Sequence, residues 1–340
     1  MEPDPELETE AWGVLNPAAA RDRKGDLYLF PRLVADGNYS RIGKARVVFR
    51  DTNPVGVERQ GIALEPEESW ERNVRSAGTE DPRITFLPDL DRYLLTYTAY
   101  GPLGPRIALA VSADLEQWER LGPASFAYDP RLRADLNLYP NKDAVLFPEQ
   151  VRAPDGTPSF AMLHRPMWDL SWLGVHAGLV LPAGLDDDRP GIWVSFTSGK
   201  EVVRDVRALT RFEQHRLVAL PEHAWEALKI GAGTPPLRTP DGWLILHHGV
   251  SGRLVPGEDL QPAVNYAAGA MLLDLEDVSR VVARSTIPLL KPETEEEREG
   301  IVPNVVFPTA IDARADGSAD VYYGMADSRI GAARLRRVAE

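Results

Sequence analysis

The residues best suited to chemistry stand in Glu80-Asp81-Pro82-Arg83, where two adjacent carboxylates and a guanidinium flank a proline. An apolar run, residues 93–98, follows and has the composition of a β-strand. Proline cannot donate to a sheet ladder and pushes the preceding residue towards an extended conformation. We therefore expect Asp81 to lie extended at a strand entrance, its carboxylate held rigidly as a candidate catalytic group. Arg83 would leave the chain on the same side and could pair with Asp81 or Glu80. The alternative is a strand-initiating turn with a surface ion pair.

Two further segments place cationic side chains beside strands. Lys142 and Asp143 come directly before an apolar stretch, and Arg165 stands between His164 and Pro166 at the end of the next strand. Each arrangement fixes a charged group at a strand end, as at Asp81. The alternative for these residues is an ion pair on the surface.

A glycine-rich segment, residues 229–236, begins with Lys229 and could turn backbone N–H groups towards an anion. It lacks the Lys-Ser/Thr ending of a nucleotide phosphate loop and precedes no helix. We interpret it as a tight loop lining a channel.

His247 and His248 are adjacent at the end of a predicted strand, so they point to opposite faces and cannot both bind one metal ion. Without cysteine or a His/carboxylate cluster at ligand spacing, we expect no metal site. Asn16 precedes Pro17 and either caps a turn or binds a sugar hydroxyl. Most of the following aromatic residues are expected in the core, with one or two stacking on a sugar ring: Trp168, Trp172, Trp193, Trp225, Trp243, Tyr100, Tyr139 and Tyr266.

The composition excludes several classes of partner. The 340 residues are 44% hydrophobic and carry a net charge of −13, with scattered basic residues, which argues against nucleic acid or an anionic membrane. No apolar run approaches the roughly 20 residues that span a bilayer. Residues 1–10 are acidic and show no secretory signal, and the lack of cysteine favours a cytoplasmic location.

Short strands separated by turn residues predict an all-β fold. The strands are expected at residues 27–30, 45–49, 93–98, 107–111, 159–163, 243–247 and 321–323. Helices of at most a turn or two are expected at residues 222–229 and 293–299.

A loose repeat predicts the architecture. Residues 40–45 recur as 105–110 and 328–333, with weaker copies at 191–195 and 268–274. Five units of about 68 residues fit a five-bladed β-propeller over residues 12–340, after a flexible acidic tail of residues 1–11. Two β-sandwiches would need a linker that the sequence does not show.

Nine motifs, in their order along the chain, resemble those of the β-mannoside phosphorylases of glycoside hydrolase family 130, over residues 12–336. The motifs are Asn16-Pro17, 80–84, 141–149, 164–166, 229–236, 248–250, 272–277, 304–308 and 322–327. The resemblance implies a five-bladed propeller that cleaves β-mannosides by inverting phosphorolysis, giving α-mannose 1-phosphate.

The resemblance also implies the roles of single residues. Asp81 would be the general acid. The phosphate-binding residues would be Lys142, Arg165, His248 and Lys229. The substrate-binding residues would be Asn16, Arg32, Arg83, Asp143, His247, Tyr266 and Asp327. The partners would be an oligosaccharide or disaccharide and inorganic phosphate as co-substrate, with no cofactor or metal and a possible homo-oligomer.

The chemistry agrees with the resemblance. An ordinary inverting glycosidase needs two carboxylates about 6.5–9.5 Å apart, one of which activates water. Phosphate is already an anionic nucleophile and needs cations and hydrogen-bond donors instead of a base. One acid with a Lys/Arg/His cluster therefore favours phosphorolysis. The alternatives are a β-mannosidase, with Glu149 or another carboxylate as base, and a non-catalytic carbohydrate-binding propeller.

The sequence departs from the family pattern in three places. Residues 167–189 form a long insertion, residues 195–204 lack an expected Ser-x-Asp-Leu-x-x-Trp motif, and His247 replaces a common tyrosine. These departures bear on the choice of acceptor sugar and on whether phosphate or water acts as the nucleophile.

Overall fold

The computed structural model describes residues 1–73, 77–170, 181–254 and 261–337, and the all-β prediction is confirmed for them. Each strand expected from the sequence lies inside an observed strand. The described helices are short: α1 (Gly199–Arg204), α2 (Glu295–Arg298) and 3₁₀ turns at Glu8–Glu10, Pro88–Leu90, Leu136–Leu138, Val206–Thr210 and Ala224–Glu226. None of these helices is long and apolar enough to cross a membrane.

The first sheet has eight strands in the order β1-β2-β3-β5-β6-β7-β8, with β4 paired to β3. Two antiparallel meanders compose it, because β3 and β5 join only through a short parallel pairing of Tyr39 with Ala77 and Ser40 with Gly78. The bounds are β1 (Gly13–Arg21), β2 (Leu27–Ala35), β3 (Tyr39–Arg50), β4 (Asn53–Leu64), β5 (Ala77–Leu87), β6 (Arg92–Gly101), β7 (Gly104–Ser112) and β8 (Glu119–Pro123).

Three more sheets follow in the chain. The second runs β10-β12-β13-β14-β9 with β11 on β12, the third β15-β17-β18-β19 with β16 on β17, and the fourth β20-β21-β22. Their bounds are β9 (Ser125–Phe126), β10 (Asn141–Leu146), β11 (Val151–Arg152), β12 (Pro158–Pro166), β13 (Ile192–Ser198), β14 (Arg211–Ala219), β15 (Lys229–Ala232), β16 (Leu237–Thr239), β17 (Gly242–Gly252), β18 (Val264–Leu273), β19 (Val281–Arg284), β20 (Val306–Ala313), β21 (Ala319–Met325) and β22 (Arg329–Leu335).

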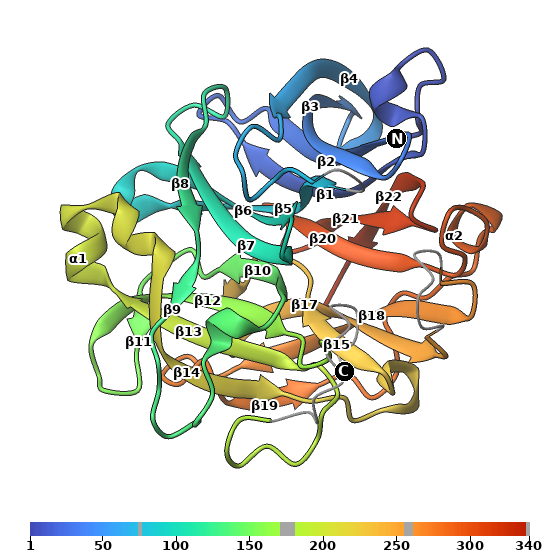
Figure 1. The fold of residues 1–340 in the computed structure, drawn as a ribbon. Coiled ribbons are helices and arrows are strands. Elements are labelled where there is room, and N and C mark those ends of the chain that lie inside the picture. Colours follow the sequence, from blue (N-terminus) through green and yellow to red (C-terminus); the bar gives the residue numbers. More distant parts are fainter. Residues whose placement is uncertain (74–76, 171–180, 255–260, 338–340) are drawn as a thin grey trace.

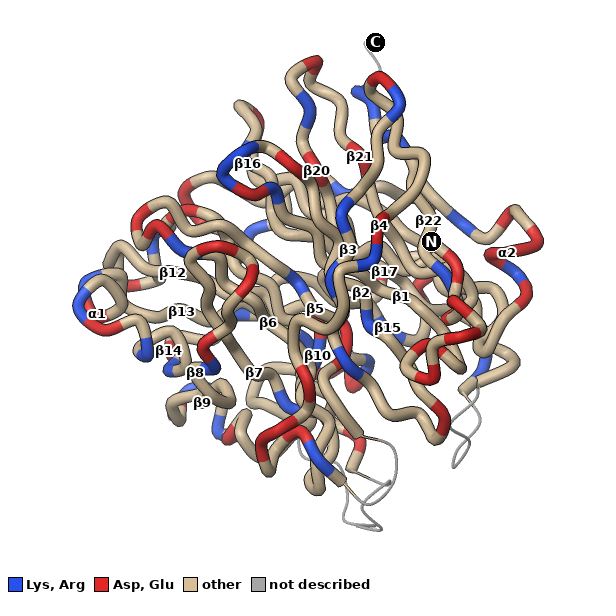
Figure 2. Tube along the Cα trace, turned by 90° about the horizontal axis from the view of Figure 1, so that it is seen from above, with Lys and Arg blue, Asp and Glu red and all other residues tan. Residues whose placement is uncertain are grey.

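The sheets lie around a common centre in chain order, so that the last lies beside the first (Figure 1). The Val14 N–H of β1 donates to the Ser328 carbonyl (3.0 Å), and Thr309 Oγ1 of β20 donates to the Pro17 carbonyl (2.7 Å). Apolar side chains fill the space between neighbouring sheets, as with Val145 and Trp243 between the second and third. Lys/Arg and Asp/Glu are interspersed along the described chain (Figure 2).

The first eleven residues, expected as a flexible tail, make specific contacts. The Met1 ammonium donates to the Ile330 carbonyl (2.7 Å), and the Ile330 N–H donates to the Met1 carbonyl (2.9 Å). Glu10 is buried and pairs with Arg59 (2.8 Å). This segment is therefore packed against the sheets.

The strands β1, β5 and β10 each carry a β-bulge near their start. The pairing register shifts between Leu15 and Ala18 in β1. It shifts between Glu80 and Arg83 in β5, and between Lys142 and Val145 in β10. A bulge sets two residues against one on the partner strand and redirects a side chain.

Each bulge contains a residue with left-handed backbone geometry: Asn16 (φ 44°), Asp81 (φ 46°) and Asp143 (φ 58°). Asn and Asp tolerate this region better than other residues with a Cβ. The expectation that Asp81 lies extended at a strand entrance is therefore wrong, because it lies inside β5 at a bulge. The preference imposed by the following proline does not decide its conformation.

The bulge of β10 is tied to the first sheet by Thr96 Oγ1, which is buried and donates to the Ala144 carbonyl (2.6 Å). Valine has the same shape without the hydroxyl. We expect Thr96→Val to lower the free energy of unfolding by about 1–3 kcal/mol, because it leaves a buried carbonyl unpaired. Urea denaturation measures this, with exposed Thr52→Val as control; equal stability of the two variants would contradict it.

Candidate active site

Asp81 is held by side chains from two other strands. Asn16 Nδ2 of β1 donates to Asp81 Oδ1 (2.8 Å), and Arg32 Nη1 of β2 donates to the same oxygen (3.2 Å). Asn16 and Asp81 are 65 residues apart and meet because both stand at bulges of neighbouring strands. The carboxylate is therefore fixed from two sides.

Glu80 connects two cations beside Asp81. Its Oε1 accepts from Arg32 Nη2 (3.0 Å) and its Oε2 accepts from Lys142 Nζ (3.1 Å). Glu80 is 3% exposed, so this carboxylate is fully committed to the two partners. The lysine predicted at a strand end lies within β10 and reaches the first sheet through this contact.

The charges around Asp81 determine its protonation. Burial acts to raise the pKa of Asp81, but Arg32, Lys142 and Arg83 outweigh it and lower the pKa below its ordinary value. The hydrogen bond from Asn16 acts in the same direction. Asp81 is thus ionised in the free protein at neutral pH.

A second buried carboxylate, Asp143, holds Arg165 and lies beside His248. Asp143 Oδ2 accepts from Arg165 Nε (2.5 Å) and is 3.5 Å from His248 Nε2. Burial opposes ionisation of Asp143, yet Arg165 and the other neighbouring cations hold its pKa well below its ordinary value. Burial lowers the pKa of His248 well below its ordinary value, so its imidazole is neutral.

Arg83 lies near both Asp81 and Asp143. Its Nη1 donates to the Asp81 carbonyl (2.7 Å) and its Nε to the Gly233 carbonyl (2.7 Å). Arg83 therefore bonds the backbone of Asp81, not either carboxylate proposed as its partner. Arg83 Nη2 and Arg165 Nη1 are buried and have no hydrogen-bond partner within the part of the chain that the structure describes.

Lys229, Tyr266 and Asp327 complete the set. Lys229 Nζ lies 5.6 Å from the centre of the Tyr266 ring. Burial, and then repulsion by Arg165, lower the pKa of Lys229 to about 7. Burial raises the pKa of Asp327 to about 6 against the attraction of Arg32, and raises that of Tyr266 above its ordinary value. Two groups of the site thus titrate near neutral pH.

The structure brings together all the site residues predicted from the sequence except one. With Glu80 they form what we call the central cluster: Asn16, Arg32, Glu80, Asp81, Arg83, Lys142, Asp143, Arg165, Lys229, His248, Tyr266 and Asp327.

The exception is His247, which points to the other face of β17, as expected for neighbours in a strand. Its Nε2 lies 3.3 Å from Glu226 Oε2, and Glu226 also accepts from Arg284 Nη2 (2.6 Å). Residues 229–232, expected within a tight loop, form strand β15. The insertion at 167–189 falls partly on residues 171–180, outside the described residues.

Sequence reasoning missed two glycines that make room for the cluster. A Cβ on Gly231 would lie 2.1 Å from Asp143 Oδ2, and one on Gly324 would lie 2.1 Å from Asn16 Oδ1. Both stood inside quoted motifs, but a close approach between strands leaves no signal in a single sequence. Phe307, with Arg83 5.4 Å over its ring, was also missed.

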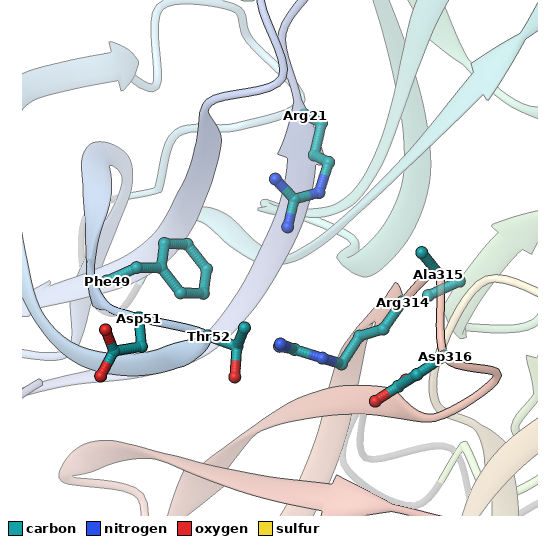
Figure 3. A pocket seen from close by; sticks show the side chains of 8 residues that line it. Arg21, Phe49, Asp51, Thr52, Arg314, Ala315 and Asp316 are labelled. Atoms are coloured by element: carbon teal, nitrogen blue, oxygen red, sulfur yellow. The ribbon is translucent and has the colours of Figure 1, made fainter.

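Other polar features lie apart from the cluster. A pocket of about 570 Å³ between the first and last sheets is lined by Arg21, Phe49 and Arg314 among others (Figure 3). Its arginines pair with Asp312 and Asp320. Within the described ranges, no group of three or more His, Asp or Glu residues is arranged to hold a metal ion.

Comparisons with known proteins agree on one family. A family profile described as beta-1,4-mannooligosaccharide phosphorylase matches residues 6–338. A 1,2-beta-oligomannan phosphorylase of Thermoanaerobacter sp. strain X514 is 33% identical, covering 98% of this chain and 93% of the relative. A beta-1,2-mannobiose phosphorylase of that organism is 32% identical over 80% of this chain and 69% of the relative. The solved beta-1,2-mannobiose phosphorylase of Listeria innocua shares the fold, with a TM-score of 0.69 and 22% identity, over 96% of this chain and 90% of that one.

The close approach at Gly324 can be tested by adding one methyl group. We expect Gly324→Ala to push the Asn16 amide away from Asp81, which removes a hydrogen bond to the carboxylate and raises the pKa of Asp81. A ¹³C NMR titration of the carboxyl group measures this shift. Gly56→Ala adds the same methyl group where nothing lies within 4 Å and serves as control. An unchanged Asp81 titration in Gly324→Ala would contradict the geometry.

Proposed function

Since the chain belongs to glycoside hydrolase family 130, the family of the β-mannoside phosphorylases, we propose that it cleaves β-mannosides with inorganic phosphate. The products are α-mannose 1-phosphate and a shortened acceptor. The observation that carries the proposal is the pair of buried guanidinium N–H groups, Arg83 Nη2 and Arg165 Nη1, that have no hydrogen-bond partner among the described residues. Leaving buried charged donors unpaired is costly, and phosphate oxygens would pair with both.

The phosphate site would combine these arginines with Lys142, Lys229 and His248. Lys229 is buried and has a lowered pKa, and a bound anion beside it would favour its charged form. Asp143 would act mainly by holding Arg165 in place. Arg83, expected to bind the sugar, fits better as a phosphate ligand because of its unpaired Nη2.

Asp81 would be the general acid, and the sugar would be bound by Asn16, Arg32, Tyr266 and Asp327. Asp81 is ionised in the free protein, whereas a general acid must hold a proton. The negative charge of bound phosphate raises the pKa of a nearby carboxyl group and so favours the protonated form. Phosphate would then serve as the nucleophile and also help the acid to hold its proton.

Hydrolysis is the weaker alternative, because water needs a carboxylate base. Glu149, the base considered from the sequence, is 47% exposed in its side chain and pairs with Arg238 outside the cluster (3.2 Å). Both oxygens of Glu80 accept hydrogen bonds from cations, and Arg165 with the other neighbouring charges holds the pKa of Asp143 well below its ordinary value. None of these three carboxylates is therefore placed to activate water, and Asp327, the cluster carboxylate whose pKa burial raises to about 6, is assigned to sugar binding in this proposal.

For the linkage, we propose β-1,2. The two relatives with the highest identities reported above are named for 1,2-beta-oligomannan and beta-1,2-mannobiose, although the family profile is named for the β-1,4 linkage. Phosphorolysis of both mannobioses by one preparation separates the two possibilities.

For the architecture, we propose five blades. The described strands fall into five antiparallel groups that start with β1, β5, β10, β15 and β20. The five copies of the sequence repeat lie in the third long strand of a group or extend one residue beyond it: β3, β7, β13, β18 and β22. The bulged first strands would then line the central channel.

The first test is whether sugar release depends on phosphate. We expect the protein to release mannose 1-phosphate from β-1,2-mannobiose with phosphate and to release no sugar without it. Asp81→Asn should lower turnover by at least about 10²-fold, because it removes the proton donor. Chromatography of the products with and without phosphate measures both effects.

Glu149→Gln is the matched control, since it makes the same change of carboxylate to amide at a residue outside the cluster. Its turnover should equal that of the unmodified protein. Sugar release that is indifferent to phosphate would overturn phosphorolysis. Loss of that release in Glu149→Gln would identify a hydrolase.

A second test uses the titration of Lys229. With a pKa of about 7, Lys229 is mostly neutral at pH 8.5 and mostly charged at pH 6. Bound phosphate should raise this pKa, so phosphate binding at pH 8.5 should take up close to one proton, and binding at pH 6 should take up none at this residue. Calorimetry in two buffers of different ionisation enthalpy measures the uptake.

Lys229→Arg keeps the cation but remains charged at both pH values. Its phosphate binding should show no proton uptake at this position. Equal uptake in the two proteins at pH 8.5 would exclude Lys229 from the phosphate site.

A further inference from the structure

A chain of four buried polar side chains crosses the second sheet, beginning beside the phosphate-binding cations. Asn141 of β10 contacts His164 Nδ1 of β12 through Nδ2 (2.9 Å), and His164 Nε2 contacts Ser195 Oγ of β13 (2.7 Å). Ser195 Oγ contacts His215 Nδ1 of β14 (2.8 Å), and His215 Nε2 contacts the Ala127 carbonyl (2.8 Å). All four side chains are at most 2% exposed, and none of them was assigned a role above.

The carbonyl at the far end fixes the direction of every hydrogen bond in this chain. The Ala127 carbonyl only accepts, so His215 carries its proton on Nε2. The neutral His215 then accepts at Nδ1 from the Ser195 hydroxyl, which in turn accepts from His164 Nε2–H. His164 Nδ1 is left as an acceptor, so it receives the Asn141 Nδ2–H. This assignment agrees with the shorter of the two Asn141 contacts, 2.9 Å to Nδ2 against 3.3 Å to Oδ1.

Both histidines are neutral in this environment, as the order of donors requires. Burial lowers the pKa of His164 well below its ordinary value, and burial also lowers the pKa of His215. The ring of Phe126 covers both, with centroid distances of 4.9 Å to His164 and 5.7 Å to His215.

These hydrogen-bonded side chains join β10 and β12 where few backbone hydrogen bonds link the two strands. The pairing of Lys142 with Arg165 brings two phosphate-site cations together, and the only other pair on that side of the bulge is Asn141 with Pro166. Beyond them the Met167 N–H donates to the Pro140 carbonyl (2.9 Å), but Pro140 has no N–H to return a bond, so one ladder bond is absent there. The Asn141–His164 contact joins the same two strands at this point.

We infer that His164, Ser195 and His215 are positioning residues that set phosphate affinity, by fixing Asn141 and holding Lys142 and Arg165 in register. This inference rests on the proposed function for its kinetic consequence. Its structural part, the order of the protons, stands independently of any reaction.

The order of the protons can be read directly in the unmodified protein. Long-range ¹H–¹⁵N NMR distinguishes the two neutral tautomers of histidine, and single His→Gln variants assign the signals among the six histidines. We expect the Nε2–H tautomer for both His164 and His215 across neutral pH. An Nδ1–H tautomer or a protonated ring at either residue would overturn the inference.

The kinetic consequence is tested by Ser195→Ala, which breaks the chain in the middle. We expect the KM for phosphate to rise by roughly tenfold or more, because small displacements of a binding cation weaken its charge-assisted contacts. The KM for the mannoside should change much less. In the same variant the His164 signal should lose its single-tautomer character.

Thr197→Val is the matched control, since it removes a buried hydroxyl two residues along the same strand. Thr197 Oγ1 donates to the Ala208 carbonyl (3.1 Å), outside the chain of hydrogen bonds through the two histidines. An equal rise in phosphate KM in this control, or an unchanged phosphate KM in Ser195→Ala, would overturn the inference. If the unmodified protein shows no phosphorolysis, the proposed function fails, while the tautomer measurement still decides the structural part.

Discussion

The site depends on the bulges that interrupt the strands β1, β5 and β10. A regular strand would alternate its side chains between the two faces of the sheet and would leave Asn16, Asp81 and Asp143 without a common direction. At each bulge a left-handed Asn or Asp turns its side chain out of that alternation. Strands that are far apart in the chain thereby supply groups to one place, and the glycines at 231 and 324 leave room for them.

The second constraint is the balance of buried charge. An ion buried without a partner is costly, and three cations of the cluster are paired with carboxylates: Arg32 and Lys142 with Glu80, and Arg165 with Asp143. Arg83 instead donates to the carbonyls of Asp81 and Gly233. Burial lowers the pKa of Lys229 to about 7, so that this side chain is partly neutral at neutral pH. What remains available for an incoming anion is therefore small and specific, consisting of the unpaired guanidinium N–H groups and the lysine.

The sequence was informative about which residues meet and much less so about how they are held. The order of the motifs predicted that Asp81, Lys142, Arg165 and His248 gather, and the structure agrees. The conformation of Asp81 was not predictable, because the effect of Pro82 is a bias that bulge formation overrides. The opposite directions of His247 and His248 followed from strand geometry, but the sequence could not say which of them faces the cluster. Contacts such as those of Gly231 and Gly324 depend on strands brought together by the fold, so no local pattern reveals them.

Glu80 has a consequence for how each of the two substrates affects the binding of the other. Its two oxygens join Arg32, on the side proposed for the sugar, to Lys142, on the side proposed for phosphate. Any ligand that draws one of these cations towards itself changes how strongly Glu80 holds the other. Thermodynamic reciprocity then requires that each substrate alter the affinity of its companion by the same factor. A single shared carboxylate thus couples the two binding events, so that the affinity for one substrate depends on whether the other is bound.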